Sequence, residues 1–217
     1  QAAAQYKKLL EQKTKILQLK DERPDLLNTL PDFNVRLCQI GALIIRYRAY
    51  FVDKLSEQAK LAHQELTNGK EKLELEYKTV SSVTDKYASV QEIYIQLMEH
   101  IEQHRVAELS SGQCLTGPHK DSLIVNLEGK LLKSFGSQGQ TRTAAIALKM
   151  AELEITKQEI NDEPILLLDD VLSELDEARQ SCVLNRVTGG QVIITCCEEP
   201  KRLHTSNLIR IKNGEII

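Results

Sequence analysis

The chain has 217 residues, of which 41% are hydrophobic and 27% are charged, a composition that suits one large or two small globular domains. Its formal net charge is −3 at pH 7, which excludes a globally basic surface and leaves nucleic-acid contact to a local patch. The five cysteines form no CxxC pair and no metal spacing with the five histidines, so neither a disulfide framework nor a zinc site is expected.

The first part of the chain, residues 1–110, is predicted to be a mostly helical arm subdomain. Apolar residues recur at helical spacing over residues 1–20 and again from Pro31 to about residue 63, with a break at Arg23-Pro24-Asp25 between them. The arm shows no sustained heptads, so a long coiled coil is not expected. The other elements predicted here are a half-buried strand at residues 73–77 and a helix over about residues 85–108.

The second part, residues 111–217, alternates strands with helices, a pattern that favours a parallel α/β sheet. A helix is predicted over residues 140–157. The strand at residues 164–168 has no polar alternation, so we expect it to be buried on both faces. The other predicted elements are strands at residues 114–116, 123–127, 191–195 and 207–211, a turn at 117–121, a helix near 177–187, and a last short strand after Asn213-Gly214.

Two adjacent carboxylates, Asp169 and Asp170, follow the aliphatic strand directly. Open α/β sheets bind ligands at the carboxyl ends of their strands. In phosphoryl transfer one acidic group holds Mg²⁺ and another group orients the attacking water. We therefore assign Asp169 to the metal and Asp170 to the catalytic position, although a plain strand end with a helix cap explains the pair equally well by itself.

A glycine-containing segment precedes the helix predicted over residues 140–157. Glycine lets a backbone approach a phosphate closely, the hydroxyl of Ser137 can donate to an oxygen, and a helix N-terminus is positive. A surface turn would explain the segment alone, but its spacing from the acidic strand end and from Ser173-Glu174-Leu175-Asp176 favours a phosphate site. The segment consists of Gly136, Ser137, Gln138, Gly139 and Gln140.

A phosphate-binding loop of the form GxxxxGK[ST] is absent from the 217 residues. A nucleotide site would therefore need residues that this sequence does not contain. We expect the chain alone to be inactive as an ATPase and to bind ATP weakly.

In their order and spacing, these segments resemble the motifs of ABC-type ATPases. Residues 136–140 resemble the signature motif, residues 165–170 the Walker B strand, and Ser173 to Asp176 the D-loop. The resemblance implies an ABC-type head of which this chain is the C-terminal part, with ATP and Mg²⁺ as cofactors. It also implies that two heads sandwich ATP, so that residues 136–140 act on the nucleotide of the other protomer in an ATP-dependent homodimer.

A closer resemblance is to the RecF family, carried by residues 117–121, 134–143 and 164–177. It implies a cytoplasmic DNA replication and repair ATPase that hydrolyses ATP slowly and binds duplex DNA at single-strand gaps. It further implies partnership with RecR and RecO in loading RecA during recombination and the SOS response. No apolar run approaches the roughly 20 residues of a membrane helix, and no signal peptide begins the chain, so no membrane role is expected.

The sequence departs from ABC transporters after the strand at residues 191–195. Transporters place a histidine there, whereas this chain has Cys196, preceded by Thr195. A thiol is a poor hydrogen-bond donor, so slow hydrolysis or a role for Thr195 is expected. Two other functions stay open: a chromosome-tethering head of the SMC or Rad50 type, and a non-enzymatic helical interaction module.

Overall fold

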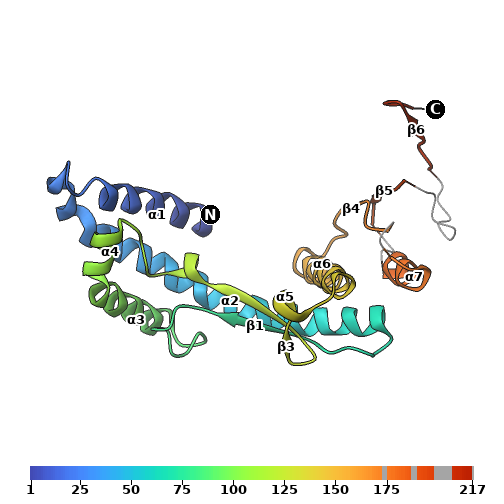
Figure 1. The fold of residues 1–217 in the computed structure, drawn as a ribbon, viewed down its shortest axis with the longest axis horizontal. Coiled ribbons are helices and arrows are strands. Elements are labelled where there is room, and N and C mark those ends of the chain that lie inside the picture. Colours follow the sequence, from blue (N-terminus) through green and yellow to red (C-terminus); the bar gives the residue numbers. More distant parts are fainter. Residues whose placement is uncertain (173–174, 187–189, 198–206, 217) are drawn as a thin grey trace. The chain divides into compact units, whose positions relative to one another are not determined.

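The computed structural model describes residues 1–172, 175–186, 190–197 and 207–216, which form helices and small sheets (Figure 1). Contacts divide the chain into two compact units. Unit 1 comprises Gln1–Glu57 and Glu74–Gly136, and unit 2 comprises Gln58–Leu73 and Ser137–Ile217. Because these units are defined by packing alone, the division into domains at 1–110 and 111–217 stays a prediction.

The helices predicted in unit 1 are present, one of them divided in two, and the short helices η1 (Pro24–Thr29) and α5 (Leu132–Phe135) were not predicted. Ser89 begins the first of the pair with a capping box, in which its side chain accepts from the N–H of Glu92. The pair then separates at His104. The helical elements are α1 (Ala2–Gln18), η1 (Pro24–Thr29), α2 (Leu30–Thr67), α3 (Val90–Gln103), α4 (Arg105–Ser111), η2 (Pro118–Lys120) and α5 (Leu132–Phe135).

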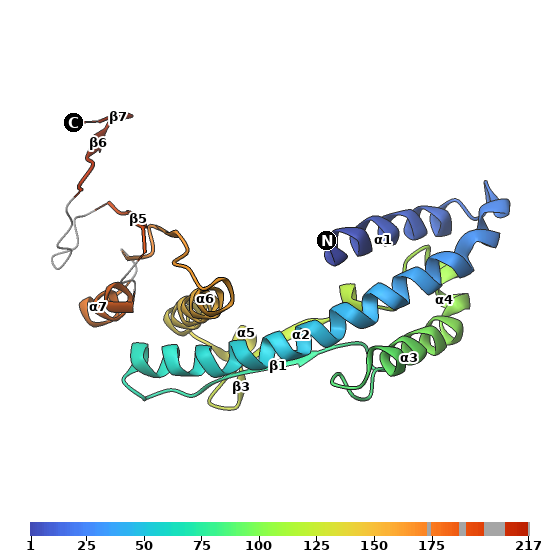
Figure 2. The same cartoon turned by 180° about the vertical axis from the view of Figure 1, so that it is seen from behind.

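The core of unit 1 lies between α2 and α3, which run alongside each other in Figures 1 and 2. Ala42, Ile45 and Ala49 recur every three or four residues along α2 and are fully buried. Ile93 and Leu97 of α3 are also fully buried in this cluster. Two alanines and an isoleucine on α2 therefore share one buried cluster with aliphatic residues of α3.

A buried ion pair joins α1 to α4 within unit 1. Lys13 Nζ donates to Glu108 Oε2 at 2.6 Å, and both side chains are almost completely buried. Glu108 Oε1 also accepts from the backbone N–H of Leu115 at 2.7 Å. Each oxygen of this carboxylate thus has a donor, which is what a buried charge requires.

The same bond explains why the strand predicted at residues 114–116 is wrong. The N–H of Leu115 is satisfied by the side chain of Glu108 rather than by a neighbouring strand. Thr116 likewise bonds through its side chain, 2.6 Å from His100 Nδ1. Side-chain hydrogen bonds therefore take the place of the backbone hydrogen bonds to a neighbouring strand that a β-strand would need here.

A three-stranded sheet in unit 1 has the order β1-β2-β3. β2 and β3 form an antiparallel hairpin, with Asn126 opposite Leu131. The prediction of strands near residues 73–77 and 123–127 is confirmed. The strands are β1 (Leu73–Lys78), β2 (Ser122–Leu127) and β3 (Lys130–Leu131).

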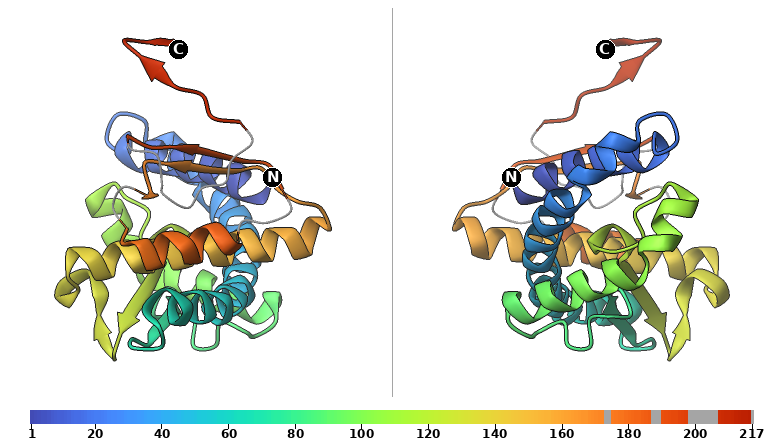
Figure 3. Two further views of the ribbon diagram at one scale, coloured as in Figure 1. Left: turned by 90° about the vertical axis from the view of Figure 1, so that its right-hand side faces the viewer. Right: turned by 90° about the vertical axis from the view of Figure 1, so that its left-hand side faces the viewer.

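In unit 2, two strands lie side by side in parallel (Figure 3). Their register places Leu166 opposite Val192 and Asp169 opposite Thr195. The predicted alternation of helix and strand is confirmed, and the fold is α/β. The elements are α6 (Gln138–Ile160), β4 (Leu166–Asp169), α7 (Glu177–Arg186), β5 (Val192–Thr195), β6 (Ile211–Lys212) and β7 (Glu215–Ile216).

Two expectations for these strands are wrong. Residues 207–210 are not a strand, since pairing is limited to the short β6–β7 hairpin around Asn213-Gly214. β4 is not buried on both faces, because Leu167 is 67% exposed. Within the described residues β4 pairs with β5 alone, and the face that carries Leu167 is left open to solvent.

Unit 2 also contains the last turns of α2. The guanidinium of Arg186 on α7 makes a bidentate ion pair with Glu65. Ala59, Ala62 and Leu66 of α2 are buried. Over the part of the chain that the structure describes, no helix has the length and apolar character to span a bilayer.

Candidate nucleotide site

The segment at residues 136–140 forms the start of α6, with Ser137 as its N-cap. The Ser137 side chain accepts from the backbone N–H of Gln140 at 3.2 Å, and Gln140 Oε1 accepts from the N–H of Ser137 at 2.9 Å. This reciprocal pair is a capping box. Because Ser137 Oγ acts only as an acceptor in the box, its hydroxyl proton stays available to a ligand at the exposed helix N-terminus.

The two glycines of this segment have different surroundings. A Cβ on Gly136 would lie 2.5 Å from Leu132 Cδ1 and 2.7 Å from Leu132 O, whereas a Cβ on Gly139 would meet no atom within 4 Å. Gly136 is therefore required by packing. Gly139 and the neighbouring Gln138 are exposed in the first turn of α6, so the backbone of Gly139 is open to a ligand.

The acidic strand end is organised by Thr195 of β5. Thr195 Oγ1 donates to Asp169 Oδ1 at 2.5 Å and accepts from the backbone N–H of Asp170 at 3.0 Å. The same N–H lies 3.1 Å from Thr195 O. Asp170 has a φ of 52°, in the left-handed region, so the chain turns sharply after β4. Both carboxylates are exposed at the carboxyl ends of the parallel strands.

Cys196, at the position where transporters have histidine, follows β5 directly. Its side chain is exposed and it forms no disulfide. Thr195 rather than Cys196 contacts both acidic residues. The alternative that the sequence raised, a role for Thr195, therefore has a geometric basis.

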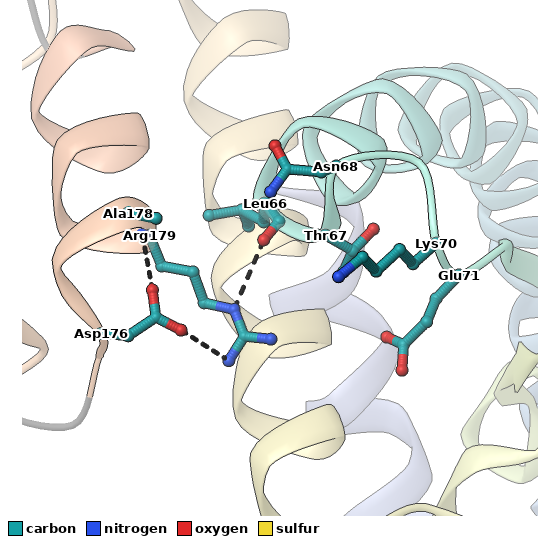
Figure 4. Close-up of a pocket in the computed structure, with 8 residues that line it drawn as sticks. All are labelled: Leu66, Thr67, Asn68, Lys70, Glu71, Asp176, Ala178 and Arg179. Atoms are coloured by element: carbon teal, nitrogen blue, oxygen red, sulfur yellow. Dashed lines mark hydrogen bonds and ion pairs between the residues drawn. The ribbon is translucent and has the colours of Figure 1, made fainter.

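The segment compared with the D-loop is described only in part, since Ser173 lies outside the described residues. Asp176 caps α7, its Oδ1 accepting from the backbone N–H of Arg179 at 2.9 Å. Arg179 in turn extends toward the end of α2, where its Nε lies 3.4 Å from Leu66 O (Figure 4). These residues line a pocket of about 180 Å³ together with Thr67, Asn68, Lys70, Glu71 and Ala178.

The acidic strand end offers a metal ion few protein ligands. Among the described residues, no group of three or more His, Cys, Asp or Glu side chains could hold a metal ion. Mg²⁺ typically takes one or two carboxylates from the protein and completes its coordination with water and phosphate oxygens. Asp169, exposed and beside a hydroxyl, fits that requirement.

In unit 1, the turn at residues 117–121 serves the packing of the sheet. Asp121 accepts from Arg48 Nη1 at 2.9 Å, from Thr79 Oγ1 at 2.8 Å and from the hydroxyl of Tyr77. Burial, with the neighbouring carboxylate, raises the pKa of Tyr77. Arg48 is thus engaged within unit 1, by Asp121 and by the carbonyl of Pro118.

His119, in the same turn, is engaged at both ring nitrogens. Nδ1 lies 2.9 Å from Tyr6 Oη and Nε2 lies 3.1 Å from Cys114 O. Burial is the main reason that the pKa of His119 is lowered. The ring therefore ties α1 to the turn.

Two residues of the site lay beyond sequence reasoning. Glu71, 69 positions before Gln140, accepts from Gln140 Nε2 at 2.8 Å. Arg179 lines the pocket and contacts the end of α2. The turn signal Asn68-Gly69 places Glu71 in a loop, but no pattern in the sequence links that loop to α6.

Comparison with known proteins gives the chain relatives along nearly its whole length, although no family model matches it. It is 37% identical over 193 residues to the DNA replication and repair protein RecF of Agathobacter rectalis, covering 89% of this chain and 50% of that protein. It is 35% identical over 221 residues to the RecF of Clostridium tetani, covering 98% of this chain and 58% of that protein. The chain is similar to part of RecF.

A solved structure agrees with this similarity. The recombination mediator protein RecF-ATPrS in the RecFOR pathway superposes with a TM-score of 0.85 at 30% identity, over 99% of this chain and 57% of that one. The expected resemblance to RecF and the expected fold class, an ABC-ATPase-like α/β head with a helical arm, are confirmed. The chain spans about half the length of these RecF proteins, consistent with the C-terminal portion that the motifs indicate.

Proposed function

We propose that the chain is the C-terminal part of a RecF-type head that works in DNA replication and repair as an ATPase. The observation that carries this proposal is the exposed N-terminus of α6, where Ser137 caps the helix and keeps its hydroxyl proton for a ligand. RecF relatives along nearly the whole chain support it, as does a solved RecF-ATP structure that covers all of it.

In this proposal the signature segment binds the γ-phosphate held by a second protomer. The hydroxyl of Ser137 donates to a phosphate oxygen, and the backbone at Gly139 approaches it without steric hindrance. The missing phosphate-binding loop belongs to residues outside this sequence. ATP binding and homodimer formation are then a single event.

The acidic strand end supplies the remaining groups. Asp169 would hold Mg²⁺, which when bound would neutralise phosphate charge. Asp170 orients the attacking water and accepts its proton. Thr195 holds Asp169 in place and fixes the backbone at Asp170. Asp176 and Ser173, in the D-loop, belong to the same interface between protomers.

The dimer would close on duplex DNA at single-strand gaps, and hydrolysis would release it. The proposed partners are RecR and RecO, and through them RecA on gapped DNA. The RecFOR pathway named for the structural relative supports the first two. The proposed location is the cytoplasm. Catalysis in this scheme sets how long the protein stays on DNA.

The test is to follow the mass of the full-length protein by sedimentation, with and without ATP, in an Asp170→Asn variant. The proposal expects a monomer that becomes a dimer only with ATP and persists longer than the wild-type dimer, because the water is no longer activated. A species indifferent to ATP would refute the sandwich. Wild-type turnover in the variant would move the water-orienting role to another residue.

A further inference from the structure

The carboxamide of Gln140 is bonded at both ends within unit 2. Its Oε1 accepts from the N–H of Ser137 at 2.9 Å, while its Nε2 donates to Glu71 Oε1 at 2.8 Å. A rotated amide would place its NH₂ against the Ser137 N–H and its oxygen against the carboxylate. The two partners therefore select a single orientation of the side chain.

Glu71 is itself held in a defined place. It follows the turn at Asn68-Gly69 after α2, and its side chain is 24% exposed. Its second oxygen, Oε2, lies 3.8 Å from Nε2 of His63, whose ring is fully buried. One carboxylate oxygen thus faces the buried ring while the other receives the Gln140 amide.

We propose that Glu71 is a positioning residue for the signature segment: by holding the Gln140 side chain, it fixes the N–H and hydroxyl of Ser137 at the start of α6. A hydrogen bond to an ionised carboxylate is stronger than one between neutral groups, which suits it to anchor a side chain at an exposed helix end. The effect of this anchor on nucleotide-dependent dimerisation rests on the proposed function, whereas the anchor itself does not.

The anchor also divides the roles within the segment. Ser137 occupies the oxygen of the Gln140 carboxamide and Glu71 one of its two N–H donors, so this side chain keeps a single N–H for a phosphate. Ser137 and the backbone at Gly139 are then the main phosphate-contacting groups. Gln140 then acts through Ser137, although the resemblance to ABC-type ATPases lists it with the nucleotide-contacting residues.

Two measurements on the full-length protein test the proposal. Amide hydrogen exchange at Ser137 reports whether Glu71 holds the segment in place, and ATP-dependent dimerisation reports whether that matters for function. Glu71→Ala removes the acceptor, and exchange at Ser137 should accelerate roughly tenfold, the loss expected for one hydrogen bond. Glu71→Gln keeps an acceptor oxygen and should give a smaller acceleration. Glu152→Ala, an exposed carboxylate on α6 paired with Lys149, is the matched control and should change neither reading.

A partner exchange separates positioning from a general loss of stability. Gln140→Glu retains a capping box, because Glu is accepted at that position, but sets two carboxylates against each other. Adding Glu71→Gln restores one donor and one acceptor. The single variant should weaken the dimer, and the pair should recover both dimer affinity and slow exchange at Ser137.

The outcomes are distinct. If hydrogen exchange at Ser137 is unchanged in Glu71→Ala, or if the Gln140→Glu/Glu71→Gln double variant does not recover, Glu71 does not hold the Gln140 side chain. Faster exchange together with wild-type dimer affinity would overturn its positioning role. If the wild-type protein forms no dimer with ATP, the proposed function fails instead, and hydrogen exchange alone decides the anchor.

Discussion

Thr195 Oγ1 donates to Asp169 Oδ1 at 2.5 Å across the β4–β5 pair, at positions that are register partners. The same hydroxyl accepts from the backbone N–H of Asp170. One side chain on β5 thus sets the position of the first carboxylate and of the chain that carries the second. In this protein the group next to the acids is a hydroxyl, one residue before Cys196.

Replacing Thr195 by Val should lower the proposed ATP turnover of the full-length protein roughly tenfold, because a valine of the same shape leaves Asp169 without its donor. Thr195→Ser keeps the hydroxyl and should stay near the wild-type rate. Steady-state ATP hydrolysis at saturating ATP measures both. Cys196→Ser is the neighbouring control and should change little, whereas a large loss there with none in Thr195→Val would assign the role to the cysteine.

Two substitutions of Ser137 separate helix capping from ligand contact. Asn and Asp both cap helices about as well as Ser, so Ser137→Asn and Ser137→Asp should keep the stability of α6, checked by thermal unfolding. Only Asp places a negative charge where the proposed phosphate sits. ATP-dependent dimerisation should therefore fail in Ser137→Asp and weaken less in Ser137→Asn, and equal dimers in both would contradict contact between this residue and phosphate.

The two glycines of the segment should respond in opposite ways to alanine. Gly136→Ala puts a Cβ against Leu132 and should cost about 1–3 kcal/mol of unfolding free energy, as overpacking does. Gly139→Ala meets nothing within 4 Å and should be neutral or stabilising by up to about 1 kcal/mol in a helix. Urea unfolding measures both. Weakened ATP-dependent dimers in the more stable Gly139→Ala protein would support close backbone approach, and unaffected dimers would contradict it.

Stability should fall as the pH is lowered from about 7.5 to about 5.5. Burial lowers the pKa of His63, His100 and His119 in the folded protein, whereas an unfolded histidine titrates near 6.5. Below that value the unfolded chain binds more protons, so the free energy of unfolding decreases with falling pH. Urea midpoints at pH 7.5, 6.5 and 5.5 measure the slope.

His119→Gln provides the matched variant for this measurement, since it removes one of the three titrating rings. The dependence on pH should become shallower than in the wild type. The pKa of the Glu65 carboxyl is lowered by Arg186. This group therefore changes the unfolding free energy only at more acidic pH, outside the range from 7.5 to 5.5. A flat or rising stability toward pH 5.5 would show that the three rings are not held neutral by the fold.

Most helices and the parallel strand pair could be predicted because local periodicity reports them directly. The expectation failed where tertiary partners decide. Leu115 bonds to Glu108 rather than to a strand, and Leu167 is exposed although its strand carries no polar alternation. In the first case a side chain takes the place of a backbone hydrogen-bond partner. In the second, the sequence shows that the strand is hydrophobic but not which element, if any, covers each of its faces.

The site was predictable in its residue types but not in its internal bonds. The spacing of Ser137 and Gln140 is that of a capping box, and the acidic strand end follows an aliphatic run. The contact between Gln140 and Glu71, and the bridging by Thr195, join residues 69 and 26 positions apart. Such contacts depend on how loops and strands are brought together in three dimensions, for which a single sequence has no periodic signal.

The buried pair of Lys13 and Glu108 constrains how this protein can change over evolutionary time. Losing either partner leaves an uncompensated charge in the core of unit 1, which typically costs about 3–5 kcal/mol. Losing Glu108 also removes the acceptor of the Leu115 N–H. A descendant that replaces one residue therefore passes through a poorly folding intermediate. Among related sequences, positions 13 and 108 should be substituted together, most readily by an apolar pair with a new partner for Leu115.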